Sequence, residues 1–474
     1  MGSRDPGNAD TWILYQGVRA SHSGMILYAD SALMDTKANS FTAFRKIRIV
    51  LSDTTTICGD RLYYDGETKV ADVWGKIVTL VDGKTVLTTD RLTFDRNSNT
   101  GYYETWGHVT HEYDTLDSKE GLYDVNQKIF VITNEVVMRD TSSRLLTDAL
   151  VYNTETEIAT FQSPTHIYSD SSHLYSEQGE YDSKIEVARS YRNSLVESGS
   201  RKMRCDTLFF NQAYEIAQAW GSVWIFDSAN NMTCMGNYGE TDQQARTSFV
   251  TDSALVIFVD KGDSLFLHAD TILVKNNENK DIDTVKAHYG VRCYRRDAQM
   301  VCDSLFYTAI DSVARLYYDP VVWYDSFQLV ADTMEVFLDS SGARLANLMG
   351  NMMGIQRVDF LHFNQLKGKE GVVHFEKGEP TYADITGSTQ MVYYLTEMLA
   401  DSSEALVGCN VGIGSSMRLF FKNRQAEKVT TFGKPDMTAY PPNSVPEDKR
   451  QLQGFEWKAS LRPTGRDSVF GKKN

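Results

Sequence analysis

One short stretch predicts the architecture of this chain: Gly59-Asp60-Arg61-Leu62-Tyr63-Tyr64-Asp65, followed eight residues later by Val73-Trp74-Gly75-Lys76-Ile77. It places an Asp first, a Leu two positions later, an aromatic residue two positions after the Leu, and then Asp or Asn. Such alternation of apolar and polar residues is typical of a β-strand that buries one face. The Asp and Gly residues around it favour turns.

The stretch recurs along almost the whole chain. Strong copies start at Asp60, Asp90, Asp148, Asp206, Asp303 and Asp359. With eight weaker copies, fourteen units follow one another at a mean spacing of about 30 residues. The aromatic-glycine pair also returns, at Trp106-Gly107, Trp220-Gly221, Tyr289-Gly290 and Phe432-Gly433. A fixed period of this length indicates one supersecondary unit stacked many times.

The repeat predicts an all-β fold. No amphipathic helical pattern of ten or more residues lies between the copies, and each copy is rich in β-branched and aromatic residues. We therefore expect an elongated, repeat-built β-jellyroll or solenoid of about 14 rungs of roughly 30 residues, each with two to four short strands. The repeat domain is predicted over residues 11–434. Residues 1–10 are interpreted as a leader that stands where a signal peptide was removed, and residues 435–474, with five of the nine prolines, as an extended tail.

The parity of the strand predicts which side chains point inward. The Leu at the third position and the aromatic residue at the fifth share one face, which is consistently apolar. The candidate interior residues are Leu62, Tyr64, Leu92, Phe94, Leu150, Tyr152, Leu208, Phe210, Leu305, Tyr307, Leu361 and Phe363. Alternation alone is compatible with two interiors, a filled solenoid core or an open apolar trough that takes an elongated lipid.

The repeated Asp allows two interpretations. It either accepts hydrogen bonds from backbone N–H groups at a corner, as Asp does in turns, or forms part of a ladder of cation sites. The Ca²⁺-binding pattern of β-rolls is absent and the period differs, so we predict no metal site. Cys293 and Cys302 flank a predicted turn at Asp297-Ala298, which leaves a cross-strand disulfide open.

Composition and motifs exclude several classes of function. The chain has 474 residues with 48 Lys+Arg against 63 Asp+Glu, a net charge of −15, which argues against nucleic-acid binding. No run of 18 apolar residues suits a spanning helix. We find no His-Glu-x-x-His, Walker A, Cys-x-x-Cys or Gly-x-Ser-x-Gly motif. The sequence therefore predicts a non-catalytic protein without a cofactor.

The units Gly59–Asp65 and Val73–Ile77, repeated in series, resemble the organic-solvent-tolerance (OstA-like) family. These proteins are periplasmic jellyrolls of the lipopolysaccharide transport bridge. The resemblance covers roughly residues 11–434. The chain is much longer than a minimal bridge protein and lacks the large carboxy-terminal barrel of the outer-membrane translocon.

The resemblance implies a fold, a function and partners. It implies a V-shaped jellyroll of stacked antiparallel strands whose apolar trough carries lipopolysaccharide acyl chains towards the outer membrane, with the twelve candidate residues as its lining. It implies a periplasmic location, with association to the outer membrane, and strand edges at both ends that pair with other jellyrolls of the bridge or with a second copy of this chain.

Two other functions remain open from the residues alone. One is a structural or adhesive β-solenoid with a filled core. The other is a carbohydrate-active β-helix, which needs paired carboxylates in a break of the repeat. In the tail, Phe455 and Trp457 either dock on a partner or fold back onto the last rung.

Overall fold

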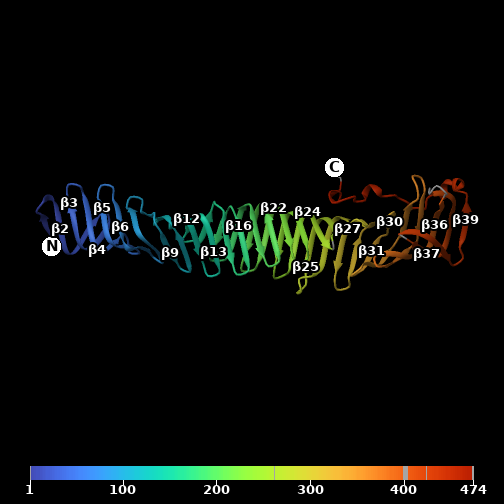
Figure 1. Ribbon diagram of the computed structural model, residues 1–474, viewed down its shortest axis with the longest axis horizontal. Coiled ribbons are helices and arrows are strands. Elements are labelled where there is room, and N and C mark those ends of the chain that lie inside the picture. Colours follow the sequence, from blue (N-terminus) through green and yellow to red (C-terminus); the bar gives the residue numbers. More distant parts are fainter. Residues whose placement is uncertain (1, 261, 399–403, 423, 472–474) are drawn as a thin grey trace. The chain divides into compact units, whose positions relative to one another are not determined.

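The computed structural model describes residues 2–260, 262–398, 404–422 and 424–471. Within them the chain forms 39 β-strands, all paired antiparallel, and four short 3₁₀ helices. By its internal contacts the chain divides into two units, residues 1–220 (unit 1) and 221–474 (unit 2). In each unit the strands follow one another in chain order, as the colours of Figure 1 show. The predicted all-β, repeat-built fold is confirmed.

Unit 1 contains the strands up to the start of β22. They are β1 Gly2–Asp5, β2 Asn8–His22, β3 Met25–Asp35, β4 Ser40–Val50, β5 Thr55–Asp65, β6 Val70–Asp82, β7 Thr85–Asp95, β8 Thr100–Tyr103, β9 Gly107–His111, β10 Asp114–Ser118, β11 Glu120–Asp124, β12 Ile129–Arg139, β13 Ser143–Asn153, β14 Ile158–Phe161, β15 Thr165–Ser169, β16 Ser172–Ser176, β17 Gln178–Asp182, β18 Val187–Arg192, β19 Ser194–Ser198, β20 Arg201–Cys205, β21 Thr207–Asn211 and β22 Ile216–Asp227.

Unit 2 contains the later strands and the 3₁₀ helices. They are β23 Met232–Asp242, β24 Thr247–Asp260, β25 Asp263–Asn276, β26 Ile282–Tyr294, β27 Ala298–Thr308, β28 Val313–Tyr317, β29 Val321–Tyr324, β30 Phe327–Val330, β31 Thr333–Asp339, β32 Gly342–Met349, β33 Met353–Arg357, β34 Phe363–Lys367, β35 Glu370–Glu376, β36 Glu379–Met398, β37 Glu404–Lys422, β38 Gln425–Phe432, β39 Asp436–Tyr440, η1 Pro442–Ser444, η2 Glu447–Lys449, η3 Ala459–Leu461 and η4 Asp467–Phe470.

Each repeat supplies two strands, and each strand is bent near its middle. In the pair β4–β5 the register shifts between Phe44 and Ile47, and in β5–β6 it shifts between Cys58 and Arg61. Elsewhere the bend splits the strand in two, as in β10 and β11. We call the half that carries the Leu and the aromatic residue the motif arm, and the other half the opposite arm. The two arms of a strand meet at this bend.

The last Asp or Asn of the repeat builds the turn at the tip of the motif arm. Oδ1 of Asp65 accepts hydrogen bonds from the backbone N–H groups of Glu67 and Thr68, at 2.8 and 3.1 Å. These bonds hold the pKa of the Asp65 carboxyl below its usual value. The turn then ends at Lys69, whose φ is +61°. The same residue types therefore recur because an Asx turn needs a short side chain with an oxygen acceptor.

The first Asp of the repeat and the aromatic-glycine pair meet at the bend. Oδ2 of Asp60 accepts a hydrogen bond of 2.9 Å from the backbone N–H of Lys76. A Cβ atom on Gly75 would lie 2.5 Å from this carboxylate oxygen, so the position requires glycine. At this corner the Asp caps the backbone. No group of three or more His, Cys, Asp or Glu suited to a metal ion occurs in the described part of the chain.

Candidate functional site

The interior of unit 1 is filled with side chains over most of its length. The predicted interior residues are almost completely buried there: Leu62, Tyr64, Leu92, Phe94, Leu150, Tyr152, Leu208 and Phe210. The adjacent Tyr63, which the parity places outside, is 43% exposed. The aromatic rings pack on one another, as Tyr123 does on Phe130 with ring centroids 4.2 Å apart. Most of unit 1 therefore has a core and not a trough.

Hydrogen bonds close the two arms of unit 1 against each other. At the tip of the motif arm, a tyrosine reaches a polar side chain at the tip of the opposite arm, 38 to 42 residues earlier in the sequence. We call this column the tyrosine seam. Its members are Tyr64 with His22 (2.6 Å), Tyr123 with Asp82 (2.7 Å), Tyr152 with Asp114 (2.5 Å) and Tyr181 with Asp140 (2.6 Å).

Charge is balanced at one rung of the seam and not at the next. Asp82 is buried, yet its pKa is lowered: burial acts to raise it, but bonds from Lys128, Tyr123 and Thr55 together outweigh burial. Asp114 has a raised pKa, because burial outweighs its hydrogen bonds from Tyr152 and Ser183. A buried carboxylate without a cation is costly. The arms of unit 1 are thus joined by individual hydrogen bonds between named side chains, and these bonds differ in charge balance from one pair to the next.

The first strands of unit 1 enclose a hollow of ≈ 330 Å³ beside the first pair of the seam. His22, Leu62 and Tyr64 line it, together with polar groups such as Asp35 and Asn39. Two of the predicted interior residues, Leu62 and Tyr64, therefore border space at this end. Its lining is mixed in polarity, which makes it a weaker site for an acyl chain than a purely apolar cavity.

Unit 2 contains a larger cavity of ≈ 470 Å³ between its two arms, lined almost entirely by apolar side chains. Two predicted interior residues, Leu305 and Tyr307, lie in its wall. The rest of the lining comprises Phe258, Leu265, Leu267, Ile282, Val285, Cys293, Arg295, Ala298, Gln299, Met300, Ala314, Leu316, Val322, Tyr324, Leu329, Met334, Val336, Leu338, Gly342, Ala343, Ala346, Leu348, Phe375 and Gly378. This volume falls within the roughly 300–1,000 Å³ range of small-molecule sites.

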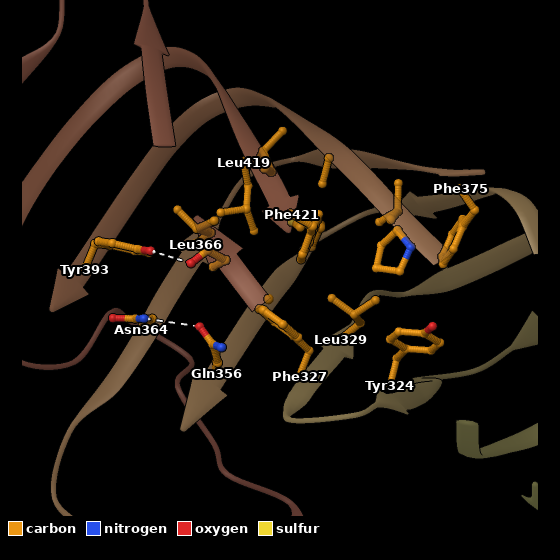
Figure 2. Close-up of a pocket in the computed structure, with 17 residues that line it drawn as sticks. Tyr324, Phe327, Leu329, Gln356, Asn364, Leu366, Phe375, Tyr393, Leu419 and Phe421 are labelled. Carbon is orange, nitrogen blue, oxygen red and sulfur yellow. Dashed lines mark hydrogen bonds between the residues drawn. The ribbon is translucent and has the colours of Figure 1, made fainter. Parts of the chain in front are cut away.

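A second, narrower hollow of ≈ 50 Å³ adjoins this cavity. The two share Tyr324, Leu329 and Phe375 as walls. Figure 2 shows the rings of Phe327, Phe375 and Phe421 around this space, together with Tyr324. Polar groups at its far side are bonded to protein, since Nδ2 of Asn364 donates to Oε1 of Gln356 at 3.2 Å. The apolar interior of unit 2 therefore extends from β24 to β38.

The copy predicted at Asp359 is different from the others. Oδ1 of Asp359 accepts hydrogen bonds from the N–H groups of Leu361 and His362, so these residues form a turn and not a strand. Leu361 is consequently 75% exposed and does not point inward. The strand starts only at Phe363, whose neighbours Asn364 and Leu366 face the interior. Phe363 itself lies on the outer face, against Phe455 and Trp457.

The C-terminal residues 441–471 cover the outer face of the opposite arm in unit 2, seen as the red segment above β27 and β30 in Figure 1. Three buried glutamines hold this tail through its backbone or a side chain. Gln365 bonds to the C=O of Arg450 and the N–H of Leu452, Gln328 bonds to the C=O of Glu456 and the N–H of Lys458, and Oε1 of Gln299 accepts from Nε of Arg462, all at 2.7 to 2.9 Å.

The tail resolves one expectation that the residues left open. Phe455 and Trp457 fold back, with ring centroids 5.3 and 5.4 Å from that of Phe363. Strand pairing also continues past residue 434, because β39 pairs with β37. The three glutamines alternate with Met300, Leu329 and Leu366, which line the hollows. The tail therefore supports the wall of the cavity from outside.

The cysteines carry no disulfide. Cys293 lies opposite Met300, while Cys302 lies opposite Val291, so the two thiols are not directly across from each other. Both are free, and burial raises the pKa of each to about 12. They act as small apolar side chains.

In the described residues no helix is long and apolar enough to cross a membrane.

Sequence reasoning missed most of the cavity wall. Phe258 and Leu265 lie outside the strong copies, and alternation does not separate a filled interior from a hollow one. One signal was available. Counted from the bend, the position that Asp82 takes in β6 is taken by Phe258 in β24, and the acidic residues Asp260 and Asp263 lie two residues further out, at the turn. An apolar residue at the position of Asp82 marks the part of the wall where the interior is hollow.

Comparisons with known proteins agree with the repeat. The family model described as OstA-like protein matches residues 3–131 and 122–199, all within unit 1. The matched ranges include the copies at Asp60, Asp90 and Asp148. A search of curated proteins finds no match. Residues 3–199 are therefore an OstA-like segment of the chain.

Proposed function

We propose that this protein is a non-catalytic lipid carrier that holds acyl chains of lipopolysaccharide, or of a related lipid, in the interior of unit 2. The single observation that carries the proposal is the apolar cavity of ≈ 470 Å³ between Phe258 and Gly378. The match of residues 3–199 to the OstA-like family, a transport and binding family, supports it. The protein acts in the periplasm as part of a bridge towards the outer membrane.

The physical chemistry of the site fits acyl chains better than a polar ligand. Each buried CH₂ group contributes about 0.8 kcal/mol when it leaves water. The only guanidinium in the lining belongs to Arg295, and Asp297 already binds it at 2.6 and 2.7 Å. A net charge of −15 is compatible with an anionic lipid when the protein grips the chains and leaves the phosphates in water.

Strand edges supply the partner surfaces of this proposal. Strand β1 pairs with β2 only up to Leu14, and the segment Val18–His22 of β2 has a described pairing with β3 alone. In unit 2, β39 pairs with β37. Exposed edges are templates for further strands. Other jellyrolls of the bridge, or a second copy of this chain, extend the sheet there.

The filled core of unit 1, taken alone, also fits a structural solenoid. Photo-crosslinking separates the two functions. We place a photo-reactive amino acid at Leu305, which lines the cavity, at Phe306, its outward neighbour beside Lys286, and at Phe210 in the filled core. Irradiation in cells is followed by detection of lipopolysaccharide adducts. We expect adducts at Leu305 and none at the other two positions. Absence of adducts at Leu305 in a folded protein contradicts lipid carriage and favours the structural solenoid.

A further inference from the structure

Tyr307 occupies the position of a seam tyrosine but makes no seam bond. It is the fifth residue of the copy that starts at Asp303, as Tyr64 and Tyr152 are in theirs. Those two phenols bond to His22 and Asp114. Tyr307 is partly buried, and no partner for its hydroxyl is found among the described residues. It lines the cavity instead.

The reason lies in the opposite arm. Phe258 and Leu265 lie 49 and 42 residues before Tyr307 and pair across the hairpin of β24 and β25. Counted from the bend of the strand, Phe258 stands where Asp82 stands in β6. Phe258 and Leu265 line the same cavity as Tyr307. Neither side chain accepts a hydrogen bond. The repeat has therefore kept the tyrosine and replaced its acceptor with apolar surface.

The other strongly polar side chains of the cavity wall, all of them described, are already bonded to protein. Arg295 binds Asp297 through two bonds. Gln299 donates to the C=O of Arg295 and accepts from Arg462. The hydroxyl of Tyr324 donates to the C=O of Gly378 at 3.3 Å. The phenol of Tyr307 is the hydroxyl in this wall that remains for a ligand.

We propose that the Tyr307 hydroxyl donates a hydrogen bond to a carbonyl oxygen of the bound lipid, so that the cavity selects chains attached through an ester or amide over bare hydrocarbon. This inference rests on the proposed function, since it names the part of the lipid that forms a hydrogen bond in the same cavity. A phenol in an apolar site is costly unless it is hydrogen-bonded. Burial also raises the pKa of Tyr307, which keeps the hydroxyl protonated as a donor.

The test uses Tyr307→Phe, which removes one oxygen and keeps the ring in the wall. Binding of two probes to the full chain is measured: lipid A, whose chains carry ester and amide carbonyls, and diphenylhexatriene, a hydrocarbon without an acceptor. We expect Y307F to bind lipid A roughly two- to tenfold more weakly, the effect of one hydrogen bond, and to bind diphenylhexatriene as the wild type does. The matched control is Tyr152→Phe, which removes a seam hydroxyl in unit 1 and leaves both affinities unchanged.

Each outcome has one meaning. Equal lipid A affinity in Y307F and wild type overturns the role of Tyr307 while lipid binding stands. A parallel loss for both probes also overturns it, because the variant has then changed the shape of the cavity. If the wild type binds neither probe, the proposed function itself fails. Circular dichroism confirms that the variant is folded, which we expect because the hydroxyl has no protein partner to lose.

Discussion

Unit 1 and the part of unit 2 between Phe258 and Gly378 use the same bent strands and the same repeat, yet one is closed and the other is hollow. In unit 1 the tyrosines at the tips of the motif arm bond to Asp82, Asp114 and Asp140. In unit 2 the apolar Phe258 stands at the position that corresponds to Asp82, two residues inside the turn that follows Asp260. The comparison teaches that the repeat specifies the scaffold, while a few residues at the tips decide whether the interior is open.

The comparison also moves the proposed lipid site from unit 1 to unit 2. Eight of the twelve residues predicted to line a groove belong to unit 1, where most of them are packed in a core. Only Leu305 and Tyr307 lie in the large cavity. The family match falls on unit 1, whereas the apolar cavity falls on unit 2. In the proposed function, unit 1 is the closed segment and unit 2 is the segment with space for acyl chains.

The largest expected effect comes from breaking the seam. Asp82→Asn leaves the buried end of Lys128 without its counter-charge, and removal of one partner of a buried pair costs roughly 3–5 kcal/mol of unfolding free energy. We expect the low end, since Lys128 is partly exposed. Amide hydrogen exchange in β6 and β11 measures this loss of unfolding free energy. The control, Asp72→Asn, removes the charge that faces the exposed Arg91 and costs less than about 1 kcal/mol.

The same substitution predicts a pH dependence. The folded pKa of Asp82 lies below the unfolded value of 3.8, so its contribution to stability is present above that value and is lost as the pH falls through the folded pKa. Between neutral pH and about pH 5 the contribution of Asp82 should stay constant, and at lower pH the difference between wild type and D82N should shrink. A difference that grows on acidification contradicts the assignment of Asp82 as the charged partner.

A smaller effect tests directly whether the interior of unit 1 is filled and that of unit 2 is hollow. Ala159 is completely buried in unit 1, and Ala159→Phe should overpack the core and cost about 1–3 kcal/mol. Ala314 lines the cavity of unit 2, so Ala314→Phe should fill space at little cost and reduce binding of diphenylhexatriene. Urea denaturation and probe fluorescence are measured on both variants. Equal destabilisation of the two would mean that the cavity has no room for a ring.

The smallest effect concerns the tail that backs the cavity wall. Gln328→Ala removes two buried hydrogen bonds to the tail, those to Glu456 and Lys458, and we expect a local loss of about 1–2 kcal/mol. Faster hydrogen exchange of residues 455–470 is the readout. Gln425→Ala, at an exposed position of β38, is the control and should leave exchange unchanged. An unchanged tail in Q328A would show that aromatic packing on Phe363 holds it instead.

Much of the fold could be predicted from local chemistry. The period of the repeat indicates stacked strands, and the alternation places Leu150 and Phe210 inside, as the structure has them. The prediction for the copy at Asp359 was wrong because the sequence Asp-x-Leu is also compatible with an Asx turn, and residues 359–362 form such a turn. Local patterns do not distinguish the two uses of Asp, since both depend on the same short acceptor.

The sequence by itself determined the class of architecture, the bend with its Asp60 and Gly75, the turns and the inward face, because each depends on residues near one another in the chain or on strict alternation. Only the tertiary structure decided which stretches of the interior are hollow. Closure depends on pairs such as Tyr152 and Asp114, 38 residues apart. The cavity depends on side-chain volumes summed across two arms, and the tail of residues 441–471 finds Gln328 and Gln365 only after the sheet has formed. The summed side-chain volumes and the contacts of the tail leave no periodic signal in the sequence.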